Sequence, residues 1–241
     1  MVAKKYILHI LTALMLISCI REDVNDVNIE NHTGPVTVGF VAGGAQKTRT
    51  TIDDNGISTS WSPEDKVALW ALNEETQSFS LNNQMFKMYF RHPGSRGYFT
   101  STLNAAMANG SYTYYATYPT PTSVNGTTAT FNLPDVQDGQ MGGGVAIMIA
   151  EPQTGKAALS ALTNTNASDE IFDNGLHLNM HHKMHALRMF IPHIPTKEYY
   201  GFGNEKVVRI DLALPWNIAG TISTDISNEE AAPVLTGNGS Q

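Results

Sequence analysis

The sequence predicts an all-β fold, and three observations support this prediction. Along most of the chain, short apolar segments alternate with clusters of Gly, Pro, Asn and Ser, which is typical of strands joined by turns. No stretch combines a helical apolar period with capping residues over the length of an ordinary helix. Hydrophobic residues make up 41% of the 241 residues, which is enough for a packed core.

The first eighteen residues have the layout of an export signal. Lys4 and Lys5 provide a basic end, and the apolar run from Tyr6 to Ile17 follows it. As a helix this run is too short to cross about 30 Å of hydrocarbon. We therefore expect residues 1–18 to be a signal peptide that is removed.

Cys19 is the only cysteine of the chain, and it follows directly after Leu16, Ile17 and Ser18. This order resembles the lipobox of bacterial lipoproteins, in which the signal is cut before the cysteine and its sulfur receives a lipid. The alternative interpretation is a buried thiol in an ordinary signal segment. We expect lipidation of Cys19, and the core must then hold the fold without disulfides.

Residues 19–34 are acidic and rich in Asn, without an apolar period, which predicts a flexible tether. Beyond them the strands begin. The expected strands are residues 36–42, 65–72, 84–90, 97–103, 110–119, 126–134, 145–150, 206–214 and 218–224.

Other segments between these strands carry weaker signals. The Asp-Asp-Asn-Gly sequence at residues 53–56 predicts a hairpin turn, since Asn and Gly tolerate positive φ. The fully apolar run at 145–150 predicts a strand that is buried on both faces. Residues 156–175 could form a short helix or a long loop. The chain ends in polar turn residues from Leu235 onward, and we expect no terminal strand there.

The tyrosines of residues 110–119 allow two interpretations. Tyr112, Tyr114 and Tyr118 fall on one face of a strand, and Tyr115 falls on the other. Such a row could form a platform on which sugars stack. Aromatic residues are also ordinary in sandwich strands, and we expect one face of this strand to lie in the core.

Four of the eight histidines lie between His177 and His185, which suggests zinc. On a helix, residues four apart lie about 6 Å apart along the axis, and neighbouring histidines could share one ion. On a strand the same spacing is about 13 Å, too far for one ion. The strand alternative is supported by Leu176, Leu178 and Met180 followed by Leu187, Met189 and Ile191, with a bulge or break near His182 to His185. The helical alternative is supported by a stripe of Leu176, Met180, Met184 and Leu187. No carboxylate or thiol completes a zinc set, and we expect no metal.

Composition and motifs exclude several functional classes. The net charge of −7 and fifteen scattered Lys and Arg residues argue against a nucleic-acid partner. No motif of a metalloprotease, serine hydrolase or β-lactamase occurs, and no Lys-Ser or Lys-Thr follows the glycines at 142–144 as a phosphate loop requires. We therefore expect neither an enzyme nor a bound cofactor.

The Gly- and Tyr-rich segment around residue 203 predicts a domain boundary. Residues 35–203 would then form an N-terminal β domain. Residues 204–241 are too few for a domain of the usual size of about 50 residues or more, and we expect them to be the incomplete start of a second β domain.

Three motifs together resemble the fimbrillin-like proteins of the Bacteroidales. In the first, Thr48-Arg49-Thr50 precedes Trp61, Asp65 and an apolar strand. The second is the tyrosine strand that ends in Tyr118-Pro119, and the third is the strand pair that begins near His182. His185 departs from the pattern, since the family more often has a small residue there. The resemblance covers about residues 36–225.

This resemblance implies a fimbrial subunit or surface adhesin built of transthyretin-like β-sandwich domains. Such subunits reach the outer membrane as lipoproteins, and a protease cuts after an arginine in an early loop. Loss of the first strand opens a groove that a strand of a neighbouring subunit fills. Here Arg49 is the candidate cleavage site and Val36 to Ala42 the candidate strand. The alternative is an exposed Arg49 that is never cut.

The expected partners are thus other fimbrial subunits, the outer membrane through the lipid on Cys19, and a host protein or glycan ligand. An alternative from another class is a monomeric glycan-binding surface lipoprotein that uses the tyrosine platform. A third hypothesis is a zinc-binding lipoprotein.

Overall fold

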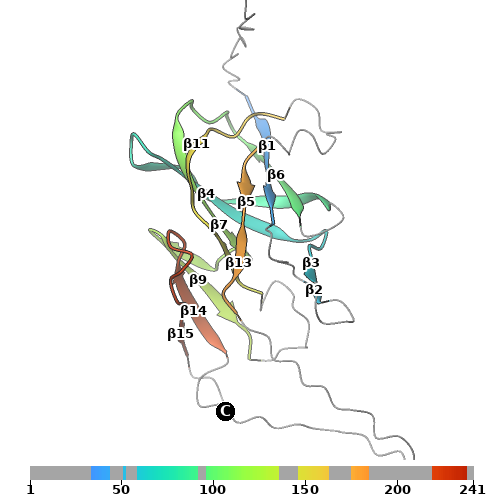
Figure 1. Ribbon diagram of the computed structural model, residues 1–241, viewed down its shortest axis with the longest axis vertical. Coiled ribbons are helices and arrows are strands. Elements are labelled where there is room, and N and C mark those ends of the chain that lie inside the picture. The colour runs from blue at the N-terminus through green and yellow to red at the C-terminus, as the bar shows by residue number, and fades with distance from the viewer. Residues whose placement is uncertain are drawn as a thin grey trace, which may run out of the picture. The chain divides into compact units, whose positions relative to one another are not determined.

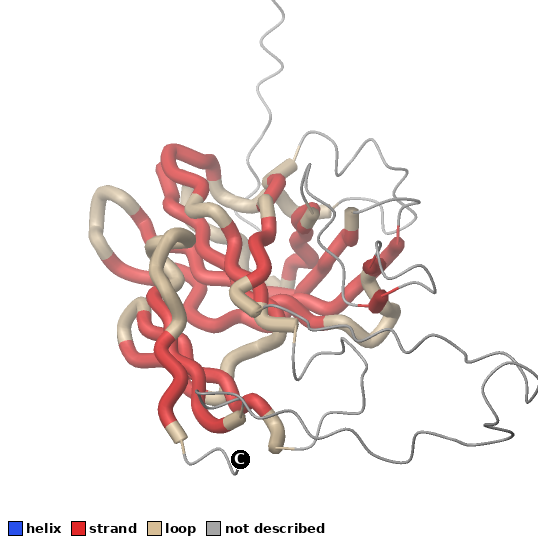
Figure 2. Tube along the Cα trace, turned by 60° about the horizontal axis from the view of Figure 1, so that its bottom comes forward, coloured by secondary structure: helices blue, strands red, loops and turns tan. Residues whose placement is uncertain are grey.

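The computed structural model describes residues 34–43, 51–52, 59–91, 96–135, 146–162, 175–184 and 219–237. The chain divides into two units, Met1–Thr33 and Gly34–Gln241, and every described residue lies in the second unit. Among these residues there are strands and loops but no helix (Figure 2), so none of them forms an apolar helix long enough to cross a membrane. The predicted all-β fold is confirmed.

The strands among the described residues form three sheets. A nine-stranded sheet has the order β12-β1-β6-β5-β4-β7-β10-β13, with β11 beside β7. A four-stranded sheet has the order β15-β14-β9-β8, and β2 pairs with β3. The strand bounds are β1 Val36–Ala42, β2 Thr51–Ile52, β3 Thr59–Ser60, β4 Lys66–Asn73, β5 Ser78–Arg91, β6 Gly97–Leu103, β7 Ser111–Tyr118, β8 Ser123–Asn125, β9 Thr128–Leu133, β10 Met148–Ala150, β11 Gln153–Ala157, β12 His177–Leu178, β13 Met180–His182, β14 Gly220–Asp225 and β15 Val234–Thr236.

The nine-stranded sheet curls until its two ends are joined. Its end strands, β12 and β13, are separated in the chain by the single residue Asn179. β12 pairs in parallel with β1, and β13 pairs antiparallel with β10. The segment from Leu176 to His182 therefore bridges both ends of the strand order, which gives a near-barrel arrangement (Figure 1).

The inner face of this curled sheet holds the larger hydrophobic core, which we call the barrel core. It collects buried side chains from β1, β4, β5, β6, β7, β10, β12 and β13, together with Trp61. On β10 and the residues before it, Ala146, Met148 and Ala150 point into this core, and Ile147 points to the opposite side. This confirms the prediction of an apolar run that is buried on both faces.

A second core, the intersheet core, lies between the outer face of β4 and β7 and the four-stranded sheet. Ala68, Trp70 and Tyr115 come from the large sheet, and Phe131 and Ile222 come from β9 and β14. In Figure 1 the four-stranded sheet accordingly lies beneath the large sheet. β4 and β7 carry apolar residues on both faces because they lie between two cores.

The four tyrosines of β7 divide between these cores. Tyr112, Tyr114 and Tyr118 lie in the barrel core, where each is at most 2% exposed, and Tyr115 lies in the intersheet core. The expected burial of this strand is confirmed. Because the rings are enclosed, they do not form a platform on which a sugar could stack.

Several strands differ from expectation. β1 and β6 coincide with the predicted residues 36–42 and 97–103, whereas β8 and β11 were not expected. The prediction that the chain has no strand from Leu235 onward was wrong, since β15 contains Leu235 and Thr236. β15 pairs with β14, and a strand of three residues becomes stable through that neighbour although its own sequence is a weak signal.

Other predictions reach the described residues only in part. The turn at 53–56 lies outside them, but the flanking strands β2 and β3 pair antiparallel. The strand expected at 206–214 also lies outside them. In the segment 156–175, residues 156–157 belong to β11 and residues 158–162 contain no helix.

The segment 204–241, expected to begin a second domain, has its described part in the same unit as the earlier strands. β14 pairs antiparallel with β9 from Gly220 to Asp225. In addition, the Lys183 ammonium donates hydrogen bonds to the carbonyls of Glu229 and Ala231. Backbone pairing between distant strands thus places residues 219–237 in the same unit as the strands before residue 203. The composition of the segment near residue 203 gives no sign of this pairing.

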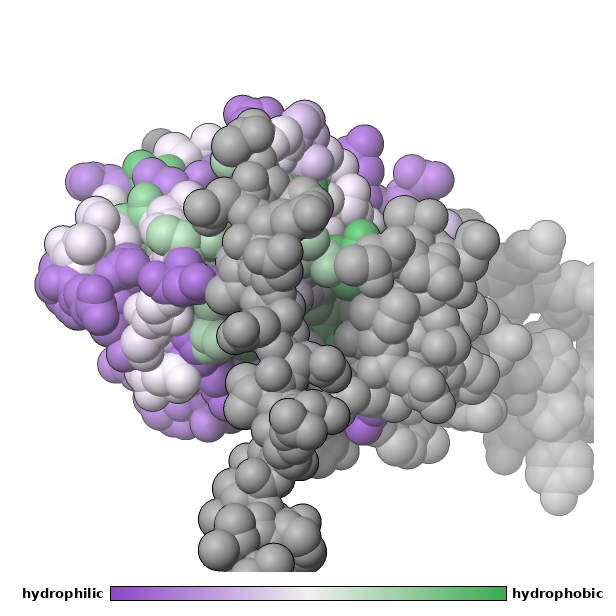
Figure 3. Space-filling model, turned by 90° about the horizontal axis from the view of Figure 1, so that it is seen from above, coloured by the Kyte–Doolittle hydropathy of each residue, from purple (hydrophilic) through white to green (hydrophobic). Residues whose placement is uncertain are grey.

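The surface of the described part is mainly polar. Seen from above in Figure 3, purple and white residues cover most of the described surface, and green residues are scattered. Within the described ranges, the large exposed hydrophobic residues are Met85, Tyr89 and Val234.

Candidate strand-exchange site

The candidate site is β1 together with the groove that holds it. β1 pairs antiparallel with β6 along its whole length, from Val36 opposite Leu103 to Ala42 opposite Gly97. Alternating apolar residues with branched or aromatic side chains favour this extended form.

The other edge of β1 is also occupied. The amide of Val41 donates to the carbonyl of Leu176 at 2.9 Å, and the amide of Gly43 donates to Leu178 at 3.0 Å. Near the start of the strand, the amide of Leu162 donates to the carbonyl of Thr37 at 2.8 Å. β1 is therefore an inserted strand with hydrogen-bond partners on both sides.

One face of β1 fills part of the barrel core. Val36, Val38, Phe40 and Ala42 belong to it, and each is at most 7% exposed. The ring of Phe40 lies 5.0 Å from that of Phe86 and 5.7 Å from that of Phe99, measured between centroids. Full burial of a side chain of this size contributes about 1.5–3 kcal/mol.

The groove around β1 is suited to binding an extended apolar strand. Without β1 it would have unpaired backbone groups along β6 and along residues 162, 176 and 178, over an apolar floor. An extended segment with apolar residues at alternate positions can satisfy both features at once.

The two sequence-predicted site residues, Cys19 and Arg49, lie outside the described residues. Their positions in the chain still matter. Arg49 falls between β1 and β2, so β1 is the one described strand that precedes it. A cut after Arg49 would separate β1 covalently from every other described strand.

The described histidines of the cluster lie on strands. His177 is on β12, His181 and His182 are on β13, and His185 lies outside the described residues. The strand interpretation is confirmed, since Leu178 and Met180 are buried as it requires. The break in the strand is at Asn179, before the expected position near His182.

His181 and His182 do not share a face. His181 is exposed, whereas the Nδ1 atom of His182 is buried without a hydrogen-bond partner, and burial lowers the pKa of His182. Within the described ranges, no three His, Cys, Asp or Glu side chains are placed to hold a metal ion.

Sequence reasoning missed the second edge of the site. Nothing in the local pattern of Ala161, Leu162 or Leu176 indicates that they pair with β1, because these contacts join residues more than a hundred positions apart. Comparison of the chain with models of protein families, with curated proteins and with solved structures finds no match.

Proposed function

We propose that this protein is a surface subunit of the fimbrillin type. It is exported as a lipoprotein, anchored in the outer membrane through Cys19, and completed in the assembled state by a strand from a neighbouring subunit. In this proposal the curled sheet and the four-stranded sheet together form the transthyretin-like sandwich. The protein acts as a structural and adhesive component, without catalysis.

The observation that carries the proposal is the place of β1. It is inserted between β6 and the segments at 162, 176 and 178, and it contributes four side chains to the barrel core. It also precedes Arg49 in the chain. One cut can free a strand in this position. Its loss without a replacement would destabilise the protein, because it exposes apolar side chains and unpaired backbone groups.

The experiment makes the cut with an added protease, so that strand exchange can be measured apart from natural cleavage at Arg49. A recognition site for a sequence-specific protease is inserted between Arg49 and Thr50 in a chain of residues 20–241, so that β1 can be cut free after the protein has folded. A labelled peptide of residues 35–43 is then added. We expect the cut protein to incorporate the peptide and release its own β1, while the uncut protein does not.

A peptide with Phe40→Asp is the matched control, because it keeps the backbone pairing but places a charge in the barrel core. We expect it to bind at least tenfold more weakly, since burying an unpaired charge is unfavourable. A cut protein that stays folded and takes up neither peptide would contradict the proposal. A chain that begins at Thr50 is expected to form polymers or bind the peptide as an open monomer.

A further inference from the structure

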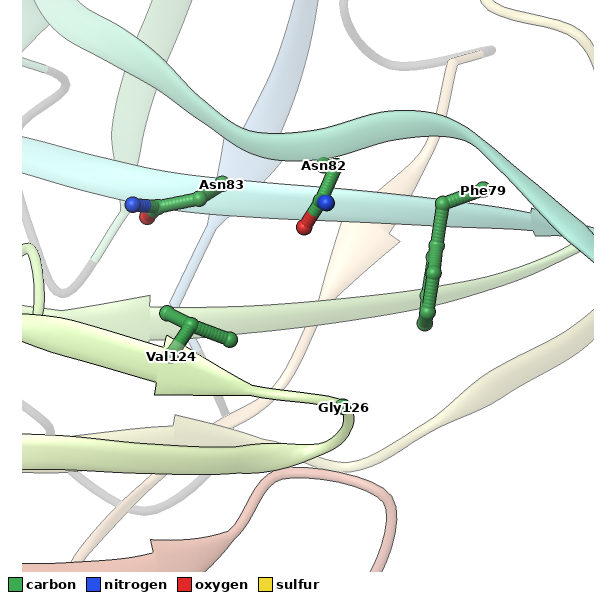
Figure 4. Close-up of a pocket in the computed structure, with 5 residues that line it drawn as sticks. All are labelled: Phe79, Asn82, Asn83, Val124 and Gly126. Atoms are coloured by element: carbon green, nitrogen blue, oxygen red, sulfur yellow. The ribbon is translucent and has the colours of Figure 1, made fainter.

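A small cavity lies between the two sheets, away from β1. Its volume is about 310 Å³, and its lining consists of Phe79, Asn82, Asn83, Val124 and Gly126. The first three residues come from β5 of the large sheet (Figure 4). Val124 belongs to β8, and Gly126 lies in the turn between β8 and β9.

A bulge in β5 presents the two asparagines side by side. In the pairing with β4, Leu69 lies opposite Gln84 and Ala71 opposite Leu81, so Asn82 and Asn83 together face one residue. Asn83 has a φ of 52°, a left-handed conformation that Asn tolerates better than most residues. In a regular strand two successive side chains point to opposite faces, but here both are exposed and both line the cavity.

The two amides are available for a ligand. Among the described residues, neither Asn82 nor Asn83 has a side-chain hydrogen bond. Each amide provides two donor hydrogens and one acceptor oxygen. In Figure 4 the side chain of Asn82 points from β5 toward the β8–β9 hairpin.

Phe79 gives the cavity an aromatic wall that is fixed in position. Its ring lies 6.5 Å from that of Tyr115 at an interplanar angle of 66°, and it packs against the intersheet core while remaining half-buried. Val124 adds an apolar side chain to the lining from β8 of the four-stranded sheet. The space beside Gly126 is open, since no atom lies within 4 Å of the position that a Cβ would take there.

This set of groups matches the chemistry of a neutral sugar. A pyranose ring has an apolar face that can lie on an aromatic ring, and its hydroxyls need both donors and acceptors, which amides supply. No charged side chain lines the cavity, so an anionic or cationic ligand would find no partner there. The volume is at the lower end of the range of about 300–1,000 Å³ for ligand pockets, which suits a single sugar unit.

We propose that this cavity binds one neutral saccharide unit of a glycan through stacking on Phe79 and hydrogen bonds to Asn82 and Asn83. The inference does not rest on strand exchange, because the cavity adjoins the intersheet core whereas β1 lines the barrel core. A negative result for sugar binding would therefore leave the strand-exchange proposal standing, and the reverse also holds.

The experiment is a titration of the residue 20–241 chain followed by ¹H–¹⁵N NMR. The probes are glucose, galactose, mannose, fucose, N-acetylglucosamine and N-acetylgalactosamine, with glucuronate as the charged comparison. We expect at least one neutral sugar to bind saturably, with shifts centred on the amides of Asn82, Asn83 and Gly126. Glucuronate should bind more weakly than glucose.

Three variants test the assigned groups. Phe79→Leu keeps an apolar side chain for the intersheet core but removes the ring, and Asn82→Ala removes one amide. Asn83→Gly removes the other amide and still permits a positive φ. Each variant should weaken binding about fivefold, as expected for the loss of one stacking contact or hydrogen bond.

Gln77→Gly is the matched control for Asn83→Gly. Gln77 is the other described non-glycine residue with positive φ, at 53°, and it lies outside the cavity lining. This variant should bind sugar as the unchanged protein does. The proposal is overturned if no neutral sugar binds saturably, or if the shifts map elsewhere and all variants bind equally.

Discussion

The phenol of Tyr118 donates a 2.8 Å hydrogen bond to the carboxylate of Asp65, and both groups are buried. Asp65 also accepts a hydrogen bond from the amide of Ser62 at 2.5 Å. The ring of Trp61 lies against that of Tyr118, at 5.4 Å between centroids. Residues that are 53 positions apart thus form one cluster, which fixes the loop before β4 against the end of β7.

Removing this phenol should destabilise the protein. Tyr118→Phe deprives a buried carboxylate of a donor, and hydrogen bonds to charged groups contribute about 1.5–3 kcal/mol. Tyr114→Phe is the matched comparison, because that phenol donates to the neutral carbonyl of Ala157 at the same distance, 2.8 Å. Its loss should lower the free energy of unfolding by about 0.5–1.5 kcal/mol. Urea unfolding measures both, and an equal or larger effect of Tyr114→Phe would contradict this account.

Glu74 should make the stability of the fold depend on acid pH. Hydrogen bonds from the Ser111 hydroxyl at 2.6 Å, the Gly155 amide at 2.8 Å and the Thr113 hydroxyl at 2.9 Å lower the pKa of Glu74 from its ordinary value of 4.5. The pKa of Glu74 is lower in the folded state than in the unfolded state. The ionised Glu74 carboxylate therefore stabilises the fold fully above about pH 4.5, and this stabilisation is lost as the pH falls through the folded pKa.

The variant Glu74→Gln should therefore show a smaller loss of stability between neutral and acid pH than the unchanged protein. The urea midpoint measured across this range tests the prediction. Glu75→Gln removes the same charge from the exposed neighbouring position and should leave the pH dependence nearly as it is. If Glu74→Gln and Glu75→Gln show the same pH dependence of the urea midpoint, the three hydrogen bonds to Glu74 do not make stability depend on acid pH.

Gly97 should not tolerate a side chain. A Cβ at this position would lie 2.8 Å from a ring carbon of Phe99 and 2.9 Å from one of Trp61, and both rings belong to the barrel core. Gly97→Ala should lower the free energy of unfolding by about 1–3 kcal/mol through overpacking. Gly34→Ala is the control, since no atom lies within 4 Å of its Cβ position. Similar urea unfolding curves for the two variants would show that the rings move aside easily.

The sequence was sufficient for the local features of the described fold. Apolar alternation and turn residues predicted β1 and β6 at their observed bounds. An uninterrupted apolar run predicted that the strand at 145–150 is buried on both faces, as Ile147 and Met148 show. These features depend on the period of the strand and on the polarity of each face, which are properties of a few consecutive residues.

Pairing between distant strands could not be predicted in this way. β12 and β13 carry a histidine pattern that fits a helix as well as a strand, and only their pairing with β1 and β10 makes them strands. The cavity was missed for a similar reason. Asn82 and Asn83 directly precede the strand expected at 84–90 and resemble an ordinary strand boundary, but the structure includes them in β5. The hairpin that faces them belongs to another sheet.

The sequence by itself determined that this chain forms strands with buried apolar faces, and it pointed to Cys19, Arg49 and the segment Val36 to Ala42. Only the tertiary structure decided that β1 has partners on both edges, that the β7 tyrosines are enclosed, and that residues 219–237 join the earlier strands. The physical reason is that strand formation follows from local side-chain alternation, whereas the neighbours of a strand depend on contacts between residues far apart in the chain.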